Sequence, residues 1–124
     1  MITGVVNSNR EPVIIIIVLG PGGVQIELEA IVDTGFNGSL TLPTELILEL
    51  GLPWQNRGSA ILANGMIDEC DIYAGKVVWD GKLRSILVEA SDTNPLVGMG
   101  LIYGSELVVL AVDGGEVTIE LLGE

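Results

Sequence analysis

The chain has 124 residues, with 17 Asp and Glu, 5 Lys and Arg and no His, so its formal net charge at pH 7 is −12. Without His, a Ser-His or Cys-His catalytic pair and a His-ligated metal site are excluded within the chain. So few cations also argue against a surface for nucleic acid or anionic lipid. We therefore expect neutral or basic partners, with no metal ion, cofactor, nucleic acid or membrane.

The length fits one domain, which we place at 1–124. Hydrophobic residues make up 48% of the chain but aromatic residues only 4%, so the core must consist of Ile, Val and Leu. Because β-branched residues are enriched in strands, this composition favours a β fold.

Three features of the sequence point to a soluble, cytoplasmic protein. Cys70 is the sole cysteine, so no disulfide can form within the chain, and a reducing compartment is the simplest setting. The apolar run Val13 to Leu19 is much shorter than the ~20 residues that span a bilayer. Arg10 and Glu11 precede it together, which is unlike the positive region of a signal peptide.

The first half of the chain predicts a hairpin followed by a short helix. Val13 to Leu19 reads as a strand that enters a Gly-Pro turn, and Val24 to Val32 alternates between apolar and polar residues, as a half-buried strand does. Thr44 to Leu50 has apolar residues at helical spacing, and Gly51 and Pro53 stop it. This is the one helix that the sequence indicates.

The second half predicts further short strands. Turns are expected at Ala63-Asn64-Gly65 and at Asp80-Gly81, because these dipeptides tolerate positive φ angles. Seven to nine strands and one helix indicate a small, mostly antiparallel β-barrel. The expected strands and apolar stretches are Ser59–Leu62, Met66–Tyr73, Lys76–Trp79, Leu83–Ala90, Leu96–Ile102, Leu107–Val112 and Val117–Leu122.

The segment Asp33-Thr34-Gly35 stands where the second strand ends. A carboxylate at the end of a buried strand is costly unless it accepts hydrogen bonds, and backbone N–H groups of a tight turn and the Thr34 hydroxyl can donate them. The simplest interpretation is an Asx-type turn that joins two strands. A catalytic carboxylate is the alternative.

Ala30 to Gly35 resembles the active-site segment of the retropepsin-like aspartic proteases, an apolar strand that ends in D-T-G. Leu96-Val97-Gly98 resembles the second signature of that family, and the short helix and a flap hairpin lie between the two in the family's order. Phe36-Asn37-Gly38 replaces the Ala that retroviral members carry and is more similar to bacterial members. Met99 and Gly100 also depart from the family pattern after the second signature.

The resemblance implies an all-β fold, a small closed antiparallel β-barrel of the acid-protease type with one short helix. It also implies an aspartic-type endopeptidase that acts on extended polypeptides. Since the chain has one D-T-G, it implies a homodimer in which each chain contributes Asp33. Two carboxylates about 3 Å apart cannot both ionise, so they share a proton; one then activates a water as general base.

The resemblance also assigns roles to other residues. Thr34 would hold the two loops together across the dimer axis, and Gly35 would let a backbone N–H approach the carboxylates. Ala63, Asn64 and Gly65 would form the tip of a flap that closes over the peptide. Leu96, Val97 and Gly98 would support the catalytic loop.

Other interpretations stay open beside the protease. The same fold could be a non-catalytic homodimeric module that binds an extended peptide, or a structural dimerisation domain without an open cleft. Asp68, Glu69 and Asp71 could form a cation site, but a solvated hairpin face is the simpler expectation. Trp54 and Trp79 are expected in the core or at a dimer contact, and one of the last two strands is expected to pair across the dimer.

Overall fold

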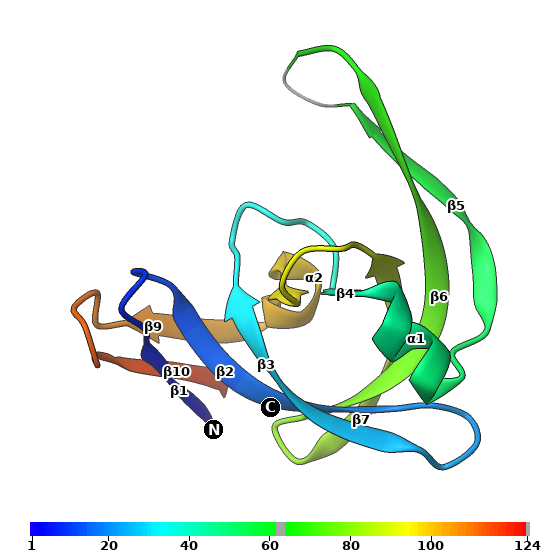
Figure 1. Ribbon diagram of the computed structural model, residues 1–124. Helices are drawn as coiled ribbons and strands as arrows, with labels where there is room; N and C mark the ends of the chain where they lie inside the picture. The colour runs from blue at the N-terminus through cyan, green and yellow to red at the C-terminus, as the bar shows by residue number, and fades with distance from the viewer. Residues whose placement is uncertain (62–63, 124) are drawn as a thin grey trace.

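The computed structural model describes residues 1–61 and 64–123. Within them, the strands belong to one ten-stranded sheet, accompanied by two short helices (Figure 1). The strands are β1 (Ile2–Val6), β2 (Pro12–Leu19), β3 (Gln25–Val32), β4 (Leu40–Leu42), β5 (Trp54–Ile61), β6 (Ile67–Trp79), β7 (Lys82–Ala90), β8 (Leu96–Val97), β9 (Ser105–Val109) and β10 (Glu116–Leu121). The helices are α1 (Thr44–Leu50) and α2 (Met99–Ile102).

The order of strands in the sheet is β5-β6-β7-β4-β8-β3-β2-β1-β10-β9, and β2 also pairs with β6. Most neighbours are antiparallel, as the sequence predicts. Two pairs are parallel, β3 with β8 and β4 with β7. Both involve the short strands around the Asp33 loop, where the chain returns to the sheet after long excursions. The prediction of an all-β fold is confirmed.

The hairpin of β2 and β3 forms the base of the sheet, as the sequence predicts. Its register runs from Val13 opposite Ile31 to Leu19 opposite Gln25. Ile14, Ile16 and Val18 on alternate positions of β2 are buried, whereas the intervening Ile15 is exposed. The neighbouring strand β3 ends in the core, with Val32 as its last and buried residue.

Helix α1 has the predicted bounds. Ile47 and Leu50 are buried, and Gly51 ends the helix in the left-handed conformation at φ 68°. Helix α2 was not predicted, so the expectation of a single helix is wrong. It lies inside the apolar stretch Leu96–Ile102, whose continuous hydrophobicity shows neither a period of two nor of 3.6, and so cannot distinguish strand from helix.

Strand β6 is longer than predicted, and strand β1 was missed. The sequence suggested a break at Ala74-Gly75, but both residues continue the ladder with β7. A Cβ atom at Gly75 would lie 3.3 Å from the Leu52 side chain, which is a tight contact. In β1, Gly4 weakens the strand pattern, yet a side chain at that position would collide with the carbonyl oxygen of Val13 on the neighbouring strand.

The buried residues form one core between the curved sheet and α1. They are Val6, Ile14, Ile16, Val18, Ala30, Val32, Leu40, Leu42, Ile47, Leu50, Leu52, Val77, Trp79, Ile86, Val88, Val97, Leu101, Ile102, Val117 and Ile119. Trp79 is a core residue as expected, but Trp54 is 56% exposed. None of the described helices is both long and apolar enough to span a bilayer.

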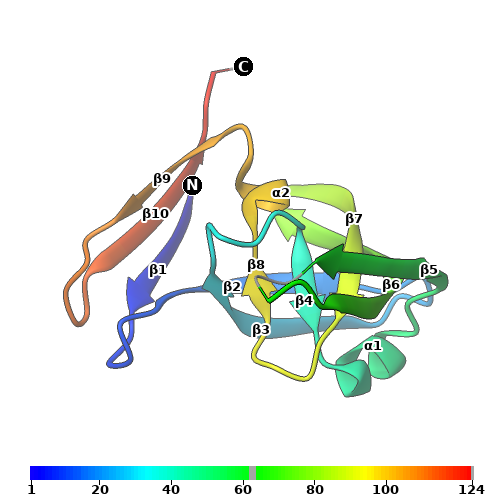
Figure 2. The same ribbon diagram turned by 90° about the horizontal axis from the view of Figure 1, so that it is seen from above.

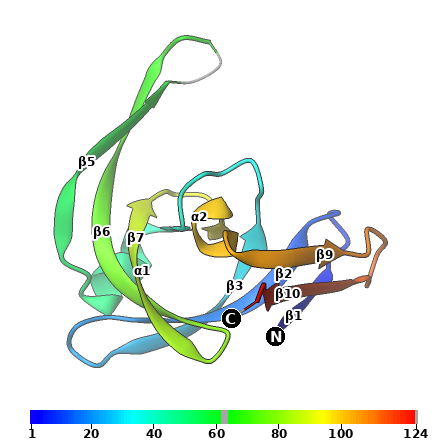
Figure 3. The same cartoon turned by 180° about the vertical axis from the view of Figure 1, so that it is seen from behind.

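Two parts of the molecule lie at the two ends of the strand order. The β5–β6 hairpin rises as a long arm, seen from opposite sides in Figures 1 and 3. Strands β1, β9 and β10 form a wing at the other end, seen from above in Figure 2, which is joined to the rest by the pairing of β1 with β2 and contributes Val6, Val117 and Ile119 to the core. Within the wing, β10 pairs with both β1 and β9 of its own chain, which leaves β9 as the edge strand. Of the last two strands, only β9 therefore offers an edge to a second chain.

Candidate functional site

Asp33 follows directly after β3 and is fixed by β8. Val32 pairs with Val97 in the parallel ladder, and the Asp33 N–H donates a hydrogen bond of 2.8 Å to the Val97 carbonyl oxygen. Val97 is fully buried. The structure therefore brings together the two segments, near residues 33 and 97, on which the family resemblance rests.

The Asp33 carboxylate is half-buried and takes part in a local turn. Its Oδ1 accepts a hydrogen bond of 2.9 Å from the Gly35 N–H, and its backbone carbonyl accepts one from the Phe36 N–H. This is the predicted Asx-type turn. Among the described residues, the other carboxylate oxygen, Oδ2, accepts no hydrogen bond, so it is available to a further donor.

Thr34 lies at the exposed tip of the same turn. Among the hydrogen bonds of the described residues, none runs from the Thr34 hydroxyl to Asp33, contrary to one expectation from the sequence. Gly35 is also exposed. The turn therefore presents Thr34 and one face of the Asp33 carboxylate to the outside of the single chain.

A second loop, residues 98–100, interlocks with the loop that follows Asp33. Gly98 N–H donates to the Ser39 carbonyl at 3.1 Å, Met99 N–H to the Phe36 carbonyl at 2.8 Å, and Gly100 N–H to the Gly38 carbonyl at 2.9 Å. A Cβ atom at position 98 would collide with the carbonyl oxygens of Gly38 and Phe36. Glycine at position 98 is required because no side chain fits between the loops.

Sequence reasoning missed Thr41, which also supports this region. Thr41 is buried in β4, and its Oγ1 accepts a hydrogen bond of 3.0 Å from the Leu96 N–H. A buried backbone N–H needs such a partner. The signal in the sequence is a single hydroxyl between Leu40 and Leu42, at a position where the apolar pattern calls for a hydrophobic residue.

The arm places two of the predicted flap residues at its far end. Strands β5 and β6 pair antiparallel, and between them Gly65 has φ 83° and the Met66 N–H donates to Asn64 Oδ1 at 3.0 Å. Asn64 and Gly65 are exposed. Ala63 lies outside the described residues. The arm and the Asp33 loop rise from the same side of the body (Figure 1).

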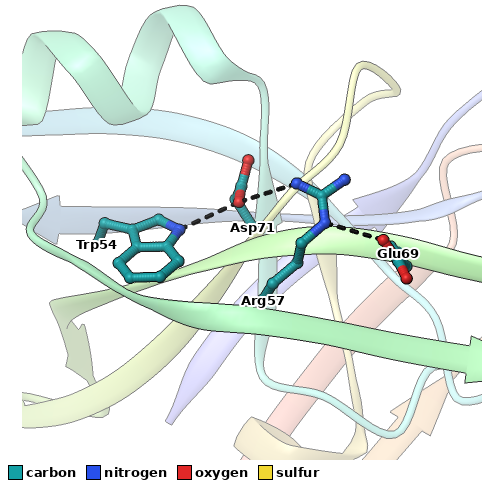
Figure 4. Close-up of polar contacts among 4 residues, drawn as sticks. All are labelled: Trp54, Arg57, Glu69 and Asp71. Carbon is teal, nitrogen blue, oxygen red and sulfur yellow. Dashed lines mark hydrogen bonds and ion pairs between the residues drawn. The ribbon is translucent and has the colours of Figure 1, made fainter.

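A polar cluster joins the two strands of the arm near its base (Figure 4). Arg57 on β5 pairs with Glu69 at 3.0 Å and with Asp71 at 3.5 Å on β6, and Trp54 Nε1 donates to the same Asp71 oxygen at 3.1 Å. The hydrogen bond to Glu69, followed by the charge of Asp71, raises the pKa of the Arg57 guanidinium. Arg57 therefore stays charged at any pH at which the protein would be studied.

The expectation of a solvated hairpin face is confirmed for Glu69 and Asp71, whose side chains are 56% and 40% exposed. The described residues contain no group of His, Cys, Asp or Glu that could hold a metal ion. A cavity of about 690 Å³ lies elsewhere, lined by the β2–β3 turn, Pro53 and residues of β6 and β7. Its walls are mainly apolar, and neither Asp33 nor its loop lines it.

No protein-family model matches the chain, and no match was found among curated proteins. The functional interpretation therefore depends on the geometry of the Asp33 loop, on the interlocked second loop and on the arm. Chemically, the site offers a carboxylate on a turn held by backbone hydrogen bonds, with one oxygen that accepts no hydrogen bond from the described residues. Such a group can act as a general base or accept hydrogen bonds from a peptide.

Proposed function

We propose that this chain is a retropepsin-like aspartic endopeptidase that works as a homodimer and hydrolyses peptide bonds of extended polypeptides. The observation that carries the proposal is the Asp33 loop, in which the D-T-G turn is held by Val97 and interlocked with Gly98. The additional pairing of β2 with β6, which brings the sheet back on itself, supports the closed barrel of that family.

In the proposed dimer, the two Asp33 carboxylates face each other across the axis. Two such groups in close contact share one proton, because both cannot be ionised together. The ionised carboxylate takes a proton from a water, which attacks the peptide carbonyl, while the protonated one donates a hydrogen bond to the carbonyl oxygen. The free Oδ2 of each chain is the oxygen available for this exchange.

The neighbouring residues have supporting roles in this scheme. The exposed Thr34 hydroxyl lies where it can hydrogen-bond to the partner chain, and the Gly35 N–H already orients Asp33 Oδ1. The arm, with Asn64 and Gly65 at its end, closes over the peptide and excludes water. A cytoplasmic setting belongs to the same proposal, since Cys70 is the sole cysteine and no disulfide can form within the chain.

A second candidate function is a homodimeric peptide-binding module without catalysis. The observation that favours it is the Asx turn, because the Gly35 N–H already satisfies one Asp33 oxygen within a single chain. Such a module would use the same arm and loop to hold an extended peptide through strand-like backbone pairing.

The two candidates are separated by incubating the protein with a mixture of unstructured peptides from about pH 4 to 8, on both sides of the ordinary carboxyl titration range. New peptide termini are read by mass spectrometry. The protease proposal predicts cleavage by the parent chain and none by Asp33→Asn, which keeps the size of the side chain but removes its charge. Asp113→Asn, in an exposed loop, is the matched control and should retain cleavage. Peptide binding without cleavage by a dimeric parent chain would favour the module instead.

A further inference from the structure

Glu89 stands at the point where the arm leaves the body of the sheet. The ladder between β6 and β7 extends as far as Ile72 opposite Glu89. From Asp71 towards the far end of the arm, β6 pairs with β5 and no longer with β7. Glu89 is therefore the residue of β7 at the root of the arm.

The Glu89 carboxylate touches both the arm and the Asp33 loop. Its Oε1 accepts a hydrogen bond of 3.6 Å from the Cys70 thiol on β6. Its Oε2 lies so close to Gly38 that a Cβ atom added there would collide with it. Gly38 belongs to the loop that begins at Asp33, so the carboxylate bridges the two parts of the molecule that would enclose a peptide.

This carboxylate is partly buried. Among the described residues, no Lys or Arg forms an ion pair with Glu89. Arg57 is engaged with Glu69 and Asp71, and Arg84 donates to the carbonyl oxygen of Leu101. A thiol is a weak hydrogen-bond donor, so it compensates little for the partial loss of water around the Glu89 carboxylate. A charged donor therefore stabilises this carboxylate more than it would stabilise a fully exposed carboxylate.

We propose, resting on the proposed function, that Glu89 selects substrates with a Lys or Arg side chain near the cleaved bond. A peptide held between the arm and the Asp33 loop passes the root of the arm, where a guanidinium or ammonium group donates hydrogen bonds to the Glu89 oxygens. The net charge of −12 favours the approach of the same basic peptides. The preferred substrate class is therefore basic polypeptide.

Binding tests this substrate class without relying on turnover. In the Asp33→Asn background, which leaves a bound peptide intact, fluorescence anisotropy is measured for labelled peptides with one Arg moved through a neutral sequence. Each peptide has a twin in which citrulline, the uncharged analogue, replaces Arg. We expect at least one Arg peptide to bind about 10-fold more tightly than its twin, the factor that corresponds to about 1.4 kcal/mol.

In the variant Glu89→Gln, the new side chain can still accept the hydrogen bond from Cys70. Each Arg peptide should bind to this variant with the same affinity as its citrulline twin. Glu106→Gln, on the exposed side of edge strand β9, is the matched control and should keep the difference. In the protein that keeps Glu89, the difference in affinity between each Arg peptide and its citrulline twin should also shrink as the salt concentration is raised. This readout requires no substitution in the site. Equal binding of all twins, no binding of any Arg peptide, or a preference that survives Glu89→Gln would overturn the proposal.

Cleavage by the parent chain is measured separately on the same peptides. Cleavage without a preference for Arg over citrulline would contradict the role of Glu89 and leave the protease proposal standing. A Glu89-dependent preference in binding, with no cleavage by the parent chain, would support the role of Glu89 and contradict the protease.

Discussion

The Asp33 loop and the β5–β6 arm are held in opposite ways. The loop is fixed by backbone hydrogen bonds to residues 97–100 and rests on the fully buried Leu40 and Val97. The arm has the ladder between its own two strands, exposed polar contacts around Arg57, and the exposed Met66 and Ile67 near its end. Rigid placement suits a group that performs chemistry, whereas a cover that admits a peptide needs a region of low local stability.

The largest expected effect comes from breaking the rigid side of this comparison with Gly98→Ala. The new methyl group would meet the backbone oxygens of Gly38 and Phe36, which cannot move without disrupting the loop. We expect a loss of about 3 kcal/mol in the free energy of unfolding, measured by urea titration, together with loss of cleavage.

Gly22→Ala is the control for this change, since a Cβ there meets no atom within 4 Å. It should leave the unfolding free energy nearly unchanged. Equal stability of Gly98→Ala and Gly22→Ala would show that the interlocked loops do not hold the site in solution.

A moderate effect is expected at Thr41, which joins β4 to β8. Thr41→Val keeps the shape of the side chain but leaves the Leu96 N–H without its partner, at a cost of about 2 kcal/mol. Thr41→Ser keeps the hydroxyl and removes one methyl group, at about 0.8 kcal/mol. Both are measured by urea unfolding, and a Val variant as stable as the Ser variant would contradict the role of the hydroxyl.

The smallest effect on global stability is expected in the arm. Arg57→Gln removes both ion pairs with β6, but these contacts are exposed and contribute little. We expect an unchanged urea midpoint and faster amide hydrogen exchange in β5 alone. Lys82→Gln, at the opposite end of the β6–β7 hairpin, should leave exchange in β5 as it was. A large drop in the midpoint for Arg57→Gln would mean that the arm is part of the cooperative core.

The parts of the fold that follow local rules could be predicted from the sequence. The β-branched run of β2, the Gly-Pro turn after it and the alternation in β3 predicted the hairpin, and the stop at Gly51 predicted the end of α1. The turn at Asp80-Gly81 also forms where predicted, with positive φ at both residues. In these cases residues close in the sequence determine the backbone.

The missed features depend on partners far away in the chain. The Thr41 hydroxyl bonds to an N–H 55 residues later, and Glu89 meets a loop that begins at Asp33. No local pattern reveals such contacts. The candidate site was predictable to the extent that it resembles a known motif, since Asp33 and Gly98 were both singled out, but the residues that surround it required the structure.

The proposed pairing of two Asp33 carboxylates is tested most directly by mixing the parent chain with Asp33→Asn chains. Chains are exchanged at constant total concentration, with enough salt to screen the repulsion between two chains of charge −12. If each active site needs Asp33 from both chains, an equal mixture retains about one quarter of the parent cleavage rate, because only dimers of two parent chains are active. Retention of about one half would mean that each chain acts alone, and would contradict the shared site.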